Sequence, residues 1–96
     1  MSCYFIANIK IHDAERYEEY LKGFDDVFSS YDAEVVCVDD DPEVLEGEWT
    51  HSRVVLIRFR DREEARRWYE SPAYQALVKH RHAASSANIM LAEGRD

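Results

Sequence analysis

His80-Arg81-His82 is the only local cluster of side chains in the sequence whose types suggest chemistry. A histidine with a near-neutral pKa is the commonest proton shuttle, so His80 is a candidate general acid or base. Arg81 could bind a carboxylate in a bidentate pair, either that of a substrate or that of Glu46 or Glu48. Both residues could instead have a purely structural role. His80 could be a core histidine with one satisfied nitrogen, and Arg81 could form a surface ion pair.

The sequence predicts neither a metal site nor a cofactor site. His80 and His82 are two positions apart on a predicted helix and point to nearly opposite sides, while His12 and His51 fall in unrelated turns. The three aspartates at 39–41 do not have the spacing of a calcium-binding loop and are expected to form a charged turn. No glycine-rich phosphate loop, nucleophile elbow or Ser/His/Asp spacing is present.

Several aromatic side chains could line a pocket for a flat organic ligand. Aromatic residues at helical spacing are more often core, so the same residues could simply fill the interior. The candidates for substrate binding are Tyr17, Trp49, Trp68 and Tyr74.

Length and charge narrow the class of protein. The chain has 96 residues and is expected to form a single domain spanning 1–96. A formal net charge of -8 argues against nucleic acid as a partner, because phosphate binding needs clustered Lys and Arg. No basic amino-terminal region precedes an apolar run, and no window approaches the roughly 20 apolar residues of a membrane span. We therefore expect a cytoplasmic protein that does not bind membranes.

Hydrophobic periodicity predicts four strands and two helical regions. Asp13 caps the first helix, which carries Tyr17, Tyr20 and Phe24 at spacings of three and four. The second helical region begins at an Asp61 cap and is broken at Ser71-Pro72, where Ser71 is an N-cap and proline occupies the first helical position. Strands are predicted at 4–11, 34–38, 53–59 and 88–92.

The order β-α-β-β-α-β predicts an α+β fold of the ferredoxin-like type, with a four-stranded antiparallel sheet and both helices on one face. The helix after Ser71 is expected to bury one face, formed by Ala73, Ala76, Leu77, His80 and Ala84. The connection at 39–52 is long enough to be functional, and it could cover either its own subunit or a partner.

The sheet face without helices is predicted to be too apolar to face water, because it carries Tyr4, Ile6, Val54, Leu56 and Met90. A patch of this kind indicates a partner surface. We expect a homodimer packed sheet to sheet with two-fold symmetry.

Three segments resemble the bacterial domain of unknown function 1330 family. They are Val44-Leu45-Glu46-Gly47-Glu48-Trp49, then Trp68-Tyr69-x-Ser71-Pro72-x-Tyr74-Gln75-x-Leu77, and Arg81 before alanines. One departure is Tyr31-Asp32, where relatives tend to have Tyr-Gly. The resemblance implies the dimeric α+β barrel superfamily, which includes cofactor-free monooxygenases of aromatic polyketides, muconolactone isomerase, and stress-responsive or haem-binding members. It also implies that five motif residues, Glu46, Trp49, Trp68, Tyr74 and Arg81, border a cavity between sheet and helices.

Two functional hypotheses follow. In the first, the protein is a small metal-free enzyme, monooxygenase-like or isomerase-like, in which Arg81 and Glu46 position a small organic molecule and His80 moves a proton. In the second, the protein is a non-catalytic ligand-binding or stress-related homodimer in which the same residues fill and fix the core. A concave pocket with convergent polar groups distinguishes the first from the second.

Overall fold

The computed structural model describes residues 1–96 as four strands and three helices. Their order confirms the predicted β-α-β-β-α-β plan, with the second helical region divided at Ser71 into two helices. None of the helices has the length and apolar composition that crossing a membrane requires. The elements are β1 (Cys3–Ile11), α1 (Ala14–Phe28), β2 (Ala33–Asp39), β3 (Arg53–Phe59), α2 (Arg62–Tyr69), α3 (Pro72–Ala84) and β4 (Ser85–Glu93).

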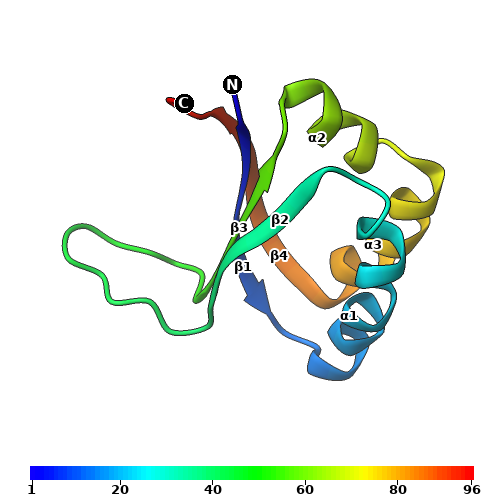
Figure 1. The fold of residues 1–96 in the computed structure, drawn as a ribbon. Coiled ribbons are helices and arrows are strands. Elements are labelled where there is room, and N and C mark those ends of the chain that lie inside the picture. Colours follow the sequence, from blue (N-terminus) through cyan, green and yellow to red (C-terminus); the bar gives the residue numbers. More distant parts are fainter.

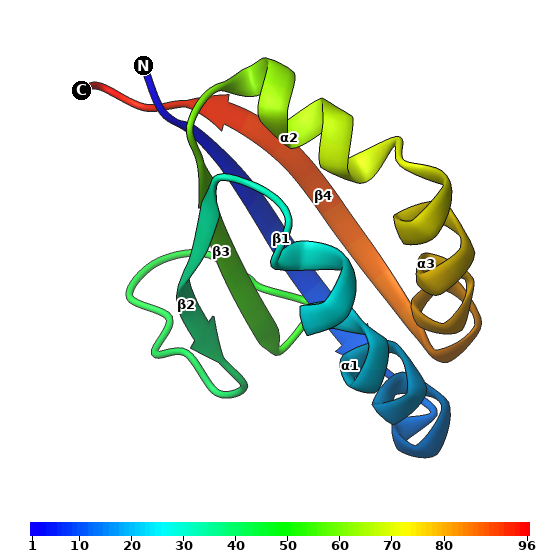
Figure 2. The same ribbon diagram turned by 45° about the vertical axis from the view of Figure 1, so that its right-hand side comes forward.

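The strands form one antiparallel sheet in the order β2-β3-β1-β4. All three helices cover the same face of this sheet, and the opposite face carries no helix (Figure 1). Figure 2 shows α1 lying along one part of the covered face, while α2 and α3 follow one another along the other. This is the ferredoxin-like arrangement predicted from the sequence.

Local capping residues explain where the helices begin. Asp13, Asp61 and Ser71 each accept a hydrogen bond from the backbone N–H three residues further on. Pro72 follows Ser71 at the first position of α3, where its missing N–H costs nothing. Each such cap stabilises its helix by about 1 kcal/mol.

Alternation along β1 separates the two faces of the sheet. Cys3, Phe5, Ala7 and Ile9 are buried against the helices. The core centres on Trp68, whose side chain is 0% exposed. Its ring packs against six other aromatic rings, those of Phe5, Phe24, Phe28, Phe59, Tyr69 and Tyr74.

The predicted buried face of α3 is wrong for most of its residues. The helix buries Tyr74, Val78, Arg81 and Ala84, whereas Ala73 and Ala76 are exposed and Leu77 and His80 are half-buried. The physical reason is area, because burying a tyrosine ring and a valine removes more apolar surface from water than burying two alanines. This rotation of α3 turns Arg81 inward and His80 outward.

A β-bulge in β2 changes which side chains of that strand face the helices. Val35 pairs with Ile57 and Val38 pairs with Val55, with a register shift between Val35 and Cys37. Residues three positions apart on a regular strand point to opposite faces. The extra residue of the bulge instead places Val35 and Val38 on the same, helix-facing side.

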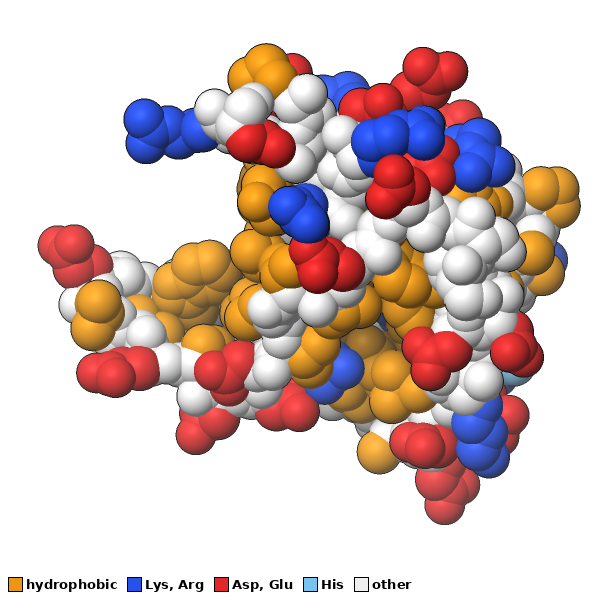
Figure 3. Space-filling view, in the orientation of Figure 1, with side chains coloured by type: hydrophobic (Ala, Val, Ile, Leu, Met, Phe, Trp, Pro, Cys, Tyr) orange, Lys and Arg blue, Asp and Glu red, His pale blue; other side chains and the backbone are white.

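The connection between β2 and β3 projects from the sheet on the side opposite the helices (Figure 1). Leu45 is 84% exposed and Trp49 is 58% exposed. Gly47 adopts a positive φ of 78°, which few residues other than glycine accept. The loop extends beside the uncovered sheet face, where hydrophobic side chains gather on the surface (Figure 3).

Glu64 of α2 is a buried carboxylate that is bonded to the connection between α1 and β2. It is 2% exposed. Its carboxylate accepts a hydrogen bond from the backbone N–H of Asp32 at 2.8 Å and another from the Arg67 Nε at 2.9 Å. Hydrogen bonds from the Arg67 guanidinium and from the Asp32 N–H hold the pKa of Glu64 below its usual range. The stabilisation is fully present above the unfolded-state pKa and is lost as the pH falls through the lowered folded-state pKa.

The Glu64→Gln variant is expected to unfold with a free energy about 1–3 kcal/mol below that of the unchanged protein at pH 7, since charge-assisted hydrogen bonds are lost. The difference should shrink as the pH falls below the ordinary carboxyl value of 4.5. Urea unfolding across this range measures both effects, with Glu63→Gln, an exposed neighbour, as the control. Equal stability of the two variants at neutral pH would contradict this role for Glu64.

Candidate functional site

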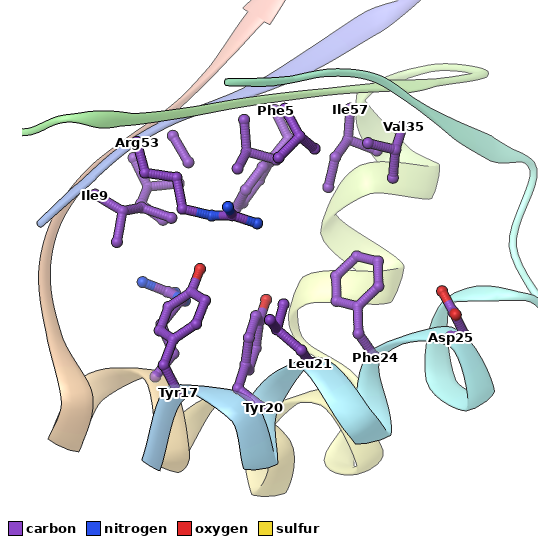
Figure 4. Close-up of a pocket in the computed structure, with 15 residues that line it drawn as sticks. Phe5, Ile9, Tyr17, Tyr20, Leu21, Phe24, Asp25, Val35, Arg53 and Ile57 are labelled. Carbon is purple, nitrogen blue, oxygen red and sulfur yellow. The ribbon is translucent and has the colours of Figure 1, made fainter. Parts of the chain in front are cut away.

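A cavity of about 150 Å³ lies between the covered face of the sheet and α1. Twelve of its 15 lining residues are hydrophobic. Figure 4 shows Phe5 and Ile57 projecting from the sheet toward Tyr20 and Phe24 of α1. The structure thus has a concave, mainly apolar space of the kind that binds small organic molecules.

The cavity opens between α1 and the edge strand β2. Its most exposed hydrophobic lining residues are Leu21 on α1, with 39% exposure, and Val35 and Val38 on β2, with 43% and 50%. The space-filling view shows a recess with a hydrophobic floor between these two elements (Figure 3). The bulge in β2 supplies two of the valines at this mouth.

Arg81 places a buried positive charge against the cavity. It reaches the cavity from α3, is 3% exposed, and lies with its guanidinium carbon 5.8 Å from the centre of the Tyr20 ring. Its Nε has no hydrogen-bond partner, and Arg81 takes part in none of the salt bridges of the chain. Because an unpaired buried charge is costly, Arg81 is the residue most in need of an anionic partner.

Arg53 is a second guanidinium at the cavity. It extends from the start of β3 toward Tyr17, whose ring centre is 5.6 Å from the guanidinium carbon (Figure 4). Its Nη1 donates to Asp40 at 2.7 Å, which balances its charge, and its Nε has no partner. Arg53 therefore offers the cavity hydrogen-bond donors rather than a free unit of charge.

Two tyrosine hydroxyls adjoin Arg81. The hydroxyls of Tyr20 and Tyr74 are 2.6 Å apart and share a hydrogen bond. Burial raises the pKa of both phenols, so both stay protonated at neutral pH. Tyr20, which lines the cavity, can position a ligand by hydrogen bonding, but neither phenol is a base at neutral pH.

Of the predicted site residues, the structure brings Arg81 and Tyr17 together at the cavity. Tyr74 lies one layer behind, where it contacts Tyr20 rather than the cavity. Trp68 is fully buried and does not line the cavity, because it is surrounded by other aromatic rings. Their side chains pack behind the cavity wall, and a role of either residue in substrate binding stays a prediction.

His80, Glu46 and Trp49 lie away from the cavity. His80 is half-buried and its Nδ1 accepts a hydrogen bond from the Arg16 Nε at 2.9 Å. Glu46 and Trp49 are exposed on the projecting loop, which is separated from the cavity by the sheet itself (Figure 1). The loop consequently does not cover the cavity of its own chain.

Arg53 was not among the predicted site residues, although its position in the sequence carried a signal. On β3, Val55, Ile57 and Phe59 are the inward-facing positions, and the same alternation places Arg53 inward as well. A charged residue at an inward position of an apolar strand is uncommon and marks a site that needs a polar group.

These residues can stabilise negative charge on a bound molecule. Guanidinium groups beside a mainly apolar cavity interact strongly with a carboxylate or an enolate oxygen. The only carboxylate among the lining residues is Asp25 on α1, where it is exposed. No group of three or more His, Cys, Asp or Glu side chains is arranged to hold a metal ion.

Comparison with known proteins agrees with the fold. Residues 2–95 match the sequence profile described as Domain of unknown function (DUF1330). No curated protein matches the chain significantly. A protein of unknown function from Rhodopseudomonas palustris, RPA0582, has a similar structure with a TM-score of 0.82 and 18% identity, covering 99% of this chain and 83% of that one.

Two further solved structures are similar. SnoaB from Streptomyces nogalater, described as a cofactor-independent oxygenase, has a TM-score of 0.69 and 18% identity, covering 99% of this chain and 94% of that one. A dimeric ferredoxin-like protein of unknown function from Thermobifida fusca has a TM-score of 0.64 and 9% identity, covering 98% and 92%. At these identities the likeness shows a shared fold.

Proposed function

The chain belongs to the DUF1330 family, and from that premise we propose that it is a cofactor-independent enzyme acting on a small organic molecule in the cavity between sheet and helices. The observation that carries the proposal is the buried guanidinium of Arg81, which faces an apolar cavity without a carboxylate partner. A substrate that becomes negatively charged during the reaction supplies that partner.

The chemistry is stabilisation of an enolate or phenolate. A carbonyl compound that is acidic enough to lose the proton beside its C=O group to water at the cavity mouth places negative charge on oxygen, and Arg81 binds that oxygen with donors already in place. The ionised substrate then either takes a proton from water at another carbon, which is isomerisation, or is oxidised by dioxygen, of which one oxygen atom enters the product and the other leaves as water. The description of SnoaB as a cofactor-independent oxygenase supports the second route for a chain of this fold.

One observation favours a second candidate, a ligand-binding protein without catalysis. Tyr20 and Tyr74 stay protonated, and His80 does not line the cavity. The interior of the cavity therefore offers no base to remove a proton from a neutral substrate. In this alternative the same arginines bind an organic anion that is already ionised.

Single-compound assays distinguish the two candidates. The purified protein is screened for thermal stabilisation by small phenols, 1,3-dicarbonyl compounds, lactones and carboxylates, since ligands that bind the native state raise the melting temperature. Each hit is then incubated under air, while oxygen consumption and product mass are recorded. Turnover without added metal or cofactor supports the enzyme, saturable binding without turnover supports the ligand-binding protein, and no hit in any class contradicts both.

We further propose that the protein forms a homodimer through the uncovered sheet face. This face carries Ile6, Leu56 and Met90 in register, and Met90 is 60% exposed. The exposed apolar residues of the projecting loop lie on the same side (Figure 1). The Thermobifida fusca protein of similar fold is described as dimeric. A contiguous apolar face of this kind favours association with a second copy.

Replacing Ile6 with lysine is expected to convert the dimer to a monomer, because two lysines would be buried near each other across a two-fold interface. Analytical ultracentrifugation of the Ile6→Lys variant measures the change. The control is Glu18→Lys on the exposed face of α1, which should leave the assembly state unaltered. A monomeric unchanged protein at all concentrations would contradict the proposed interface.

A further inference from the structure

We infer that the ligand of the cavity is a single-ring organic monoanion that binds with its charged group inward at Arg81. The inference rests on the proposed function, since it assumes that the cavity is a binding site, and it adds the size, the charge and the orientation of the bound molecule. Three independent observations carry it.

The volume limits the ligand to one ring. The cavity measures about 150 Å³, and an apolar cavity of about that volume holds one benzene molecule. Pockets for drug-sized ligands are larger, at about 300–1,000 Å³. A fused second ring would have to extend through the mouth into solvent, where it gains little contact.

The charges at the cavity match a single negative charge. Arg81 has no ion-pair partner, whereas Arg53 is already paired with Asp40 at 2.7 Å. Asp25 adds a negative charge on the α1 side of the mouth. One unbalanced positive charge remains in the interior. A monoanion neutralises it, a neutral molecule leaves it unpaired, and a dianion brings a second buried charge without a counterion.

The positions of these groups set the orientation. Arg81 is 3% exposed, at the inner end, while the mouth is formed by exposed apolar side chains such as Leu21 and Val38. Phe24 of α1 and Ile57 of the sheet project toward each other in the space between (Figure 4). A ring placed between these two side chains therefore directs its carboxylate or phenolate oxygen inward and its apolar edge toward solvent.

Four probes test size and charge separately. Isothermal titration at neutral pH compares benzoate with benzamide, phenyl phosphate and 2-naphthoate. We expect benzoate to bind about 10- to 100-fold more tightly than benzamide, which has the same shape without the charge. Phenyl phosphate should bind more weakly than benzoate, and 2-naphthoate should bind no more tightly. Tighter binding of benzamide, phenyl phosphate or 2-naphthoate than of benzoate would overturn the inference.

A change at the mouth tests the charge argument without disturbing the core. Asp25→Asn removes a repulsive carboxylate and should tighten benzoate binding about two- to fivefold while leaving benzamide binding unaltered. The matched control is Asp26→Asn, the exposed neighbour that does not line the cavity. Equal effects of the two variants on benzoate binding would count against the charge argument.

Failure of the inference and failure of the proposed function give different results. If a neutral, dianionic or two-ring probe binds best, the cavity is a binding site with another specificity, and the proposed function stands. If none of the four probes binds and the wider compound screen also gives no hit, the proposed function itself fails.

Discussion

The Arg81→Met variant is expected to lose at least about 100-fold in affinity for organic anions, because bidentate charge-assisted hydrogen bonds are removed. The same variant should be more stable than the unchanged protein when no ligand is present. Arg81 is 3% exposed and has no carboxylate partner, and an apolar side chain of similar length avoids that desolvation cost. We expect the free energy of unfolding to rise by about 1–3 kcal/mol, after allowing for the lost contact with the Tyr20 ring.

Chemical denaturation and ligand titration of the same samples measure both effects. Arg95→Met is the matched control, since Arg95 is exposed and its loss changes the net charge equally. Arg81→Lys retains the charge without the planar pair of donors. Its affinity for organic anions should lie between that of the unchanged protein and that of Arg81→Met. A variant that is destabilised yet binds anions normally would show that Arg81 serves the core and not the ligand.

The Trp68→Ala variant is expected to lose about 3–5 kcal/mol of stability, a large fraction of the total for a domain of this size. Trp68 is 0% exposed and its ring centre lies 4.1 Å from that of Tyr74. The melting temperature should fall by about 4–8 °C for each kcal/mol lost. Calorimetry or thermal unfolding followed by circular dichroism measures the change.

Trp68→Phe separates a core role from a ligand-binding role. Phenylalanine retains most of the packing and also removes the indole N–H, which is buried without a hydrogen-bond partner. This variant should cost about 1–2 kcal/mol and should leave ligand affinity unaltered, because Trp68 does not line the cavity. A marked loss of affinity in a folded Trp68→Phe protein would restore Trp68 to the binding site.

The elements could be predicted because each is specified by local residues. Asp13, Asp61 and Ser71 cap their helices through their own backbone neighbourhoods, and the alternation of β1 and β3 sets the two sheet faces. The strand β4 was predicted too short, at 88–92 instead of Ser85–Glu93. Its first residues are small and polar, and they join the sheet because β1 offers them backbone partners from Ile11 onward. This pairing with β1 depends on the tertiary structure, so no hydrophobic alternation in the sequence of these residues indicates it.

The site was harder to predict, because it depends on which face of α3 is buried. Rotating this helix by one residue changes which side chain faces the cavity. His80 and Arg81 are adjacent, and which of them faces the cavity is decided by the burial of Tyr74 and Val78 on the same helix. A pairing of Arg81 with Glu46 or Glu48, one of the alternatives considered from the sequence, requires the loop to lie on the helix side of the sheet, whereas it projects on the other side (Figure 1). Hydrophobic periodicity alone predicts neither the inward orientation of Arg81 nor the side of the sheet on which the loop projects.

The bulge in β2 also bears on how the protein avoids aggregation. β2 is an edge strand with Val35, Val36 and Val38 exposed, and a flat edge of exposed valines would act as a template for strand addition by another chain. A bulge interrupts the regular row of backbone donors and acceptors and increases the local twist. The irregularity that forms the cavity mouth therefore also makes this edge a poor template for intermolecular strand pairing.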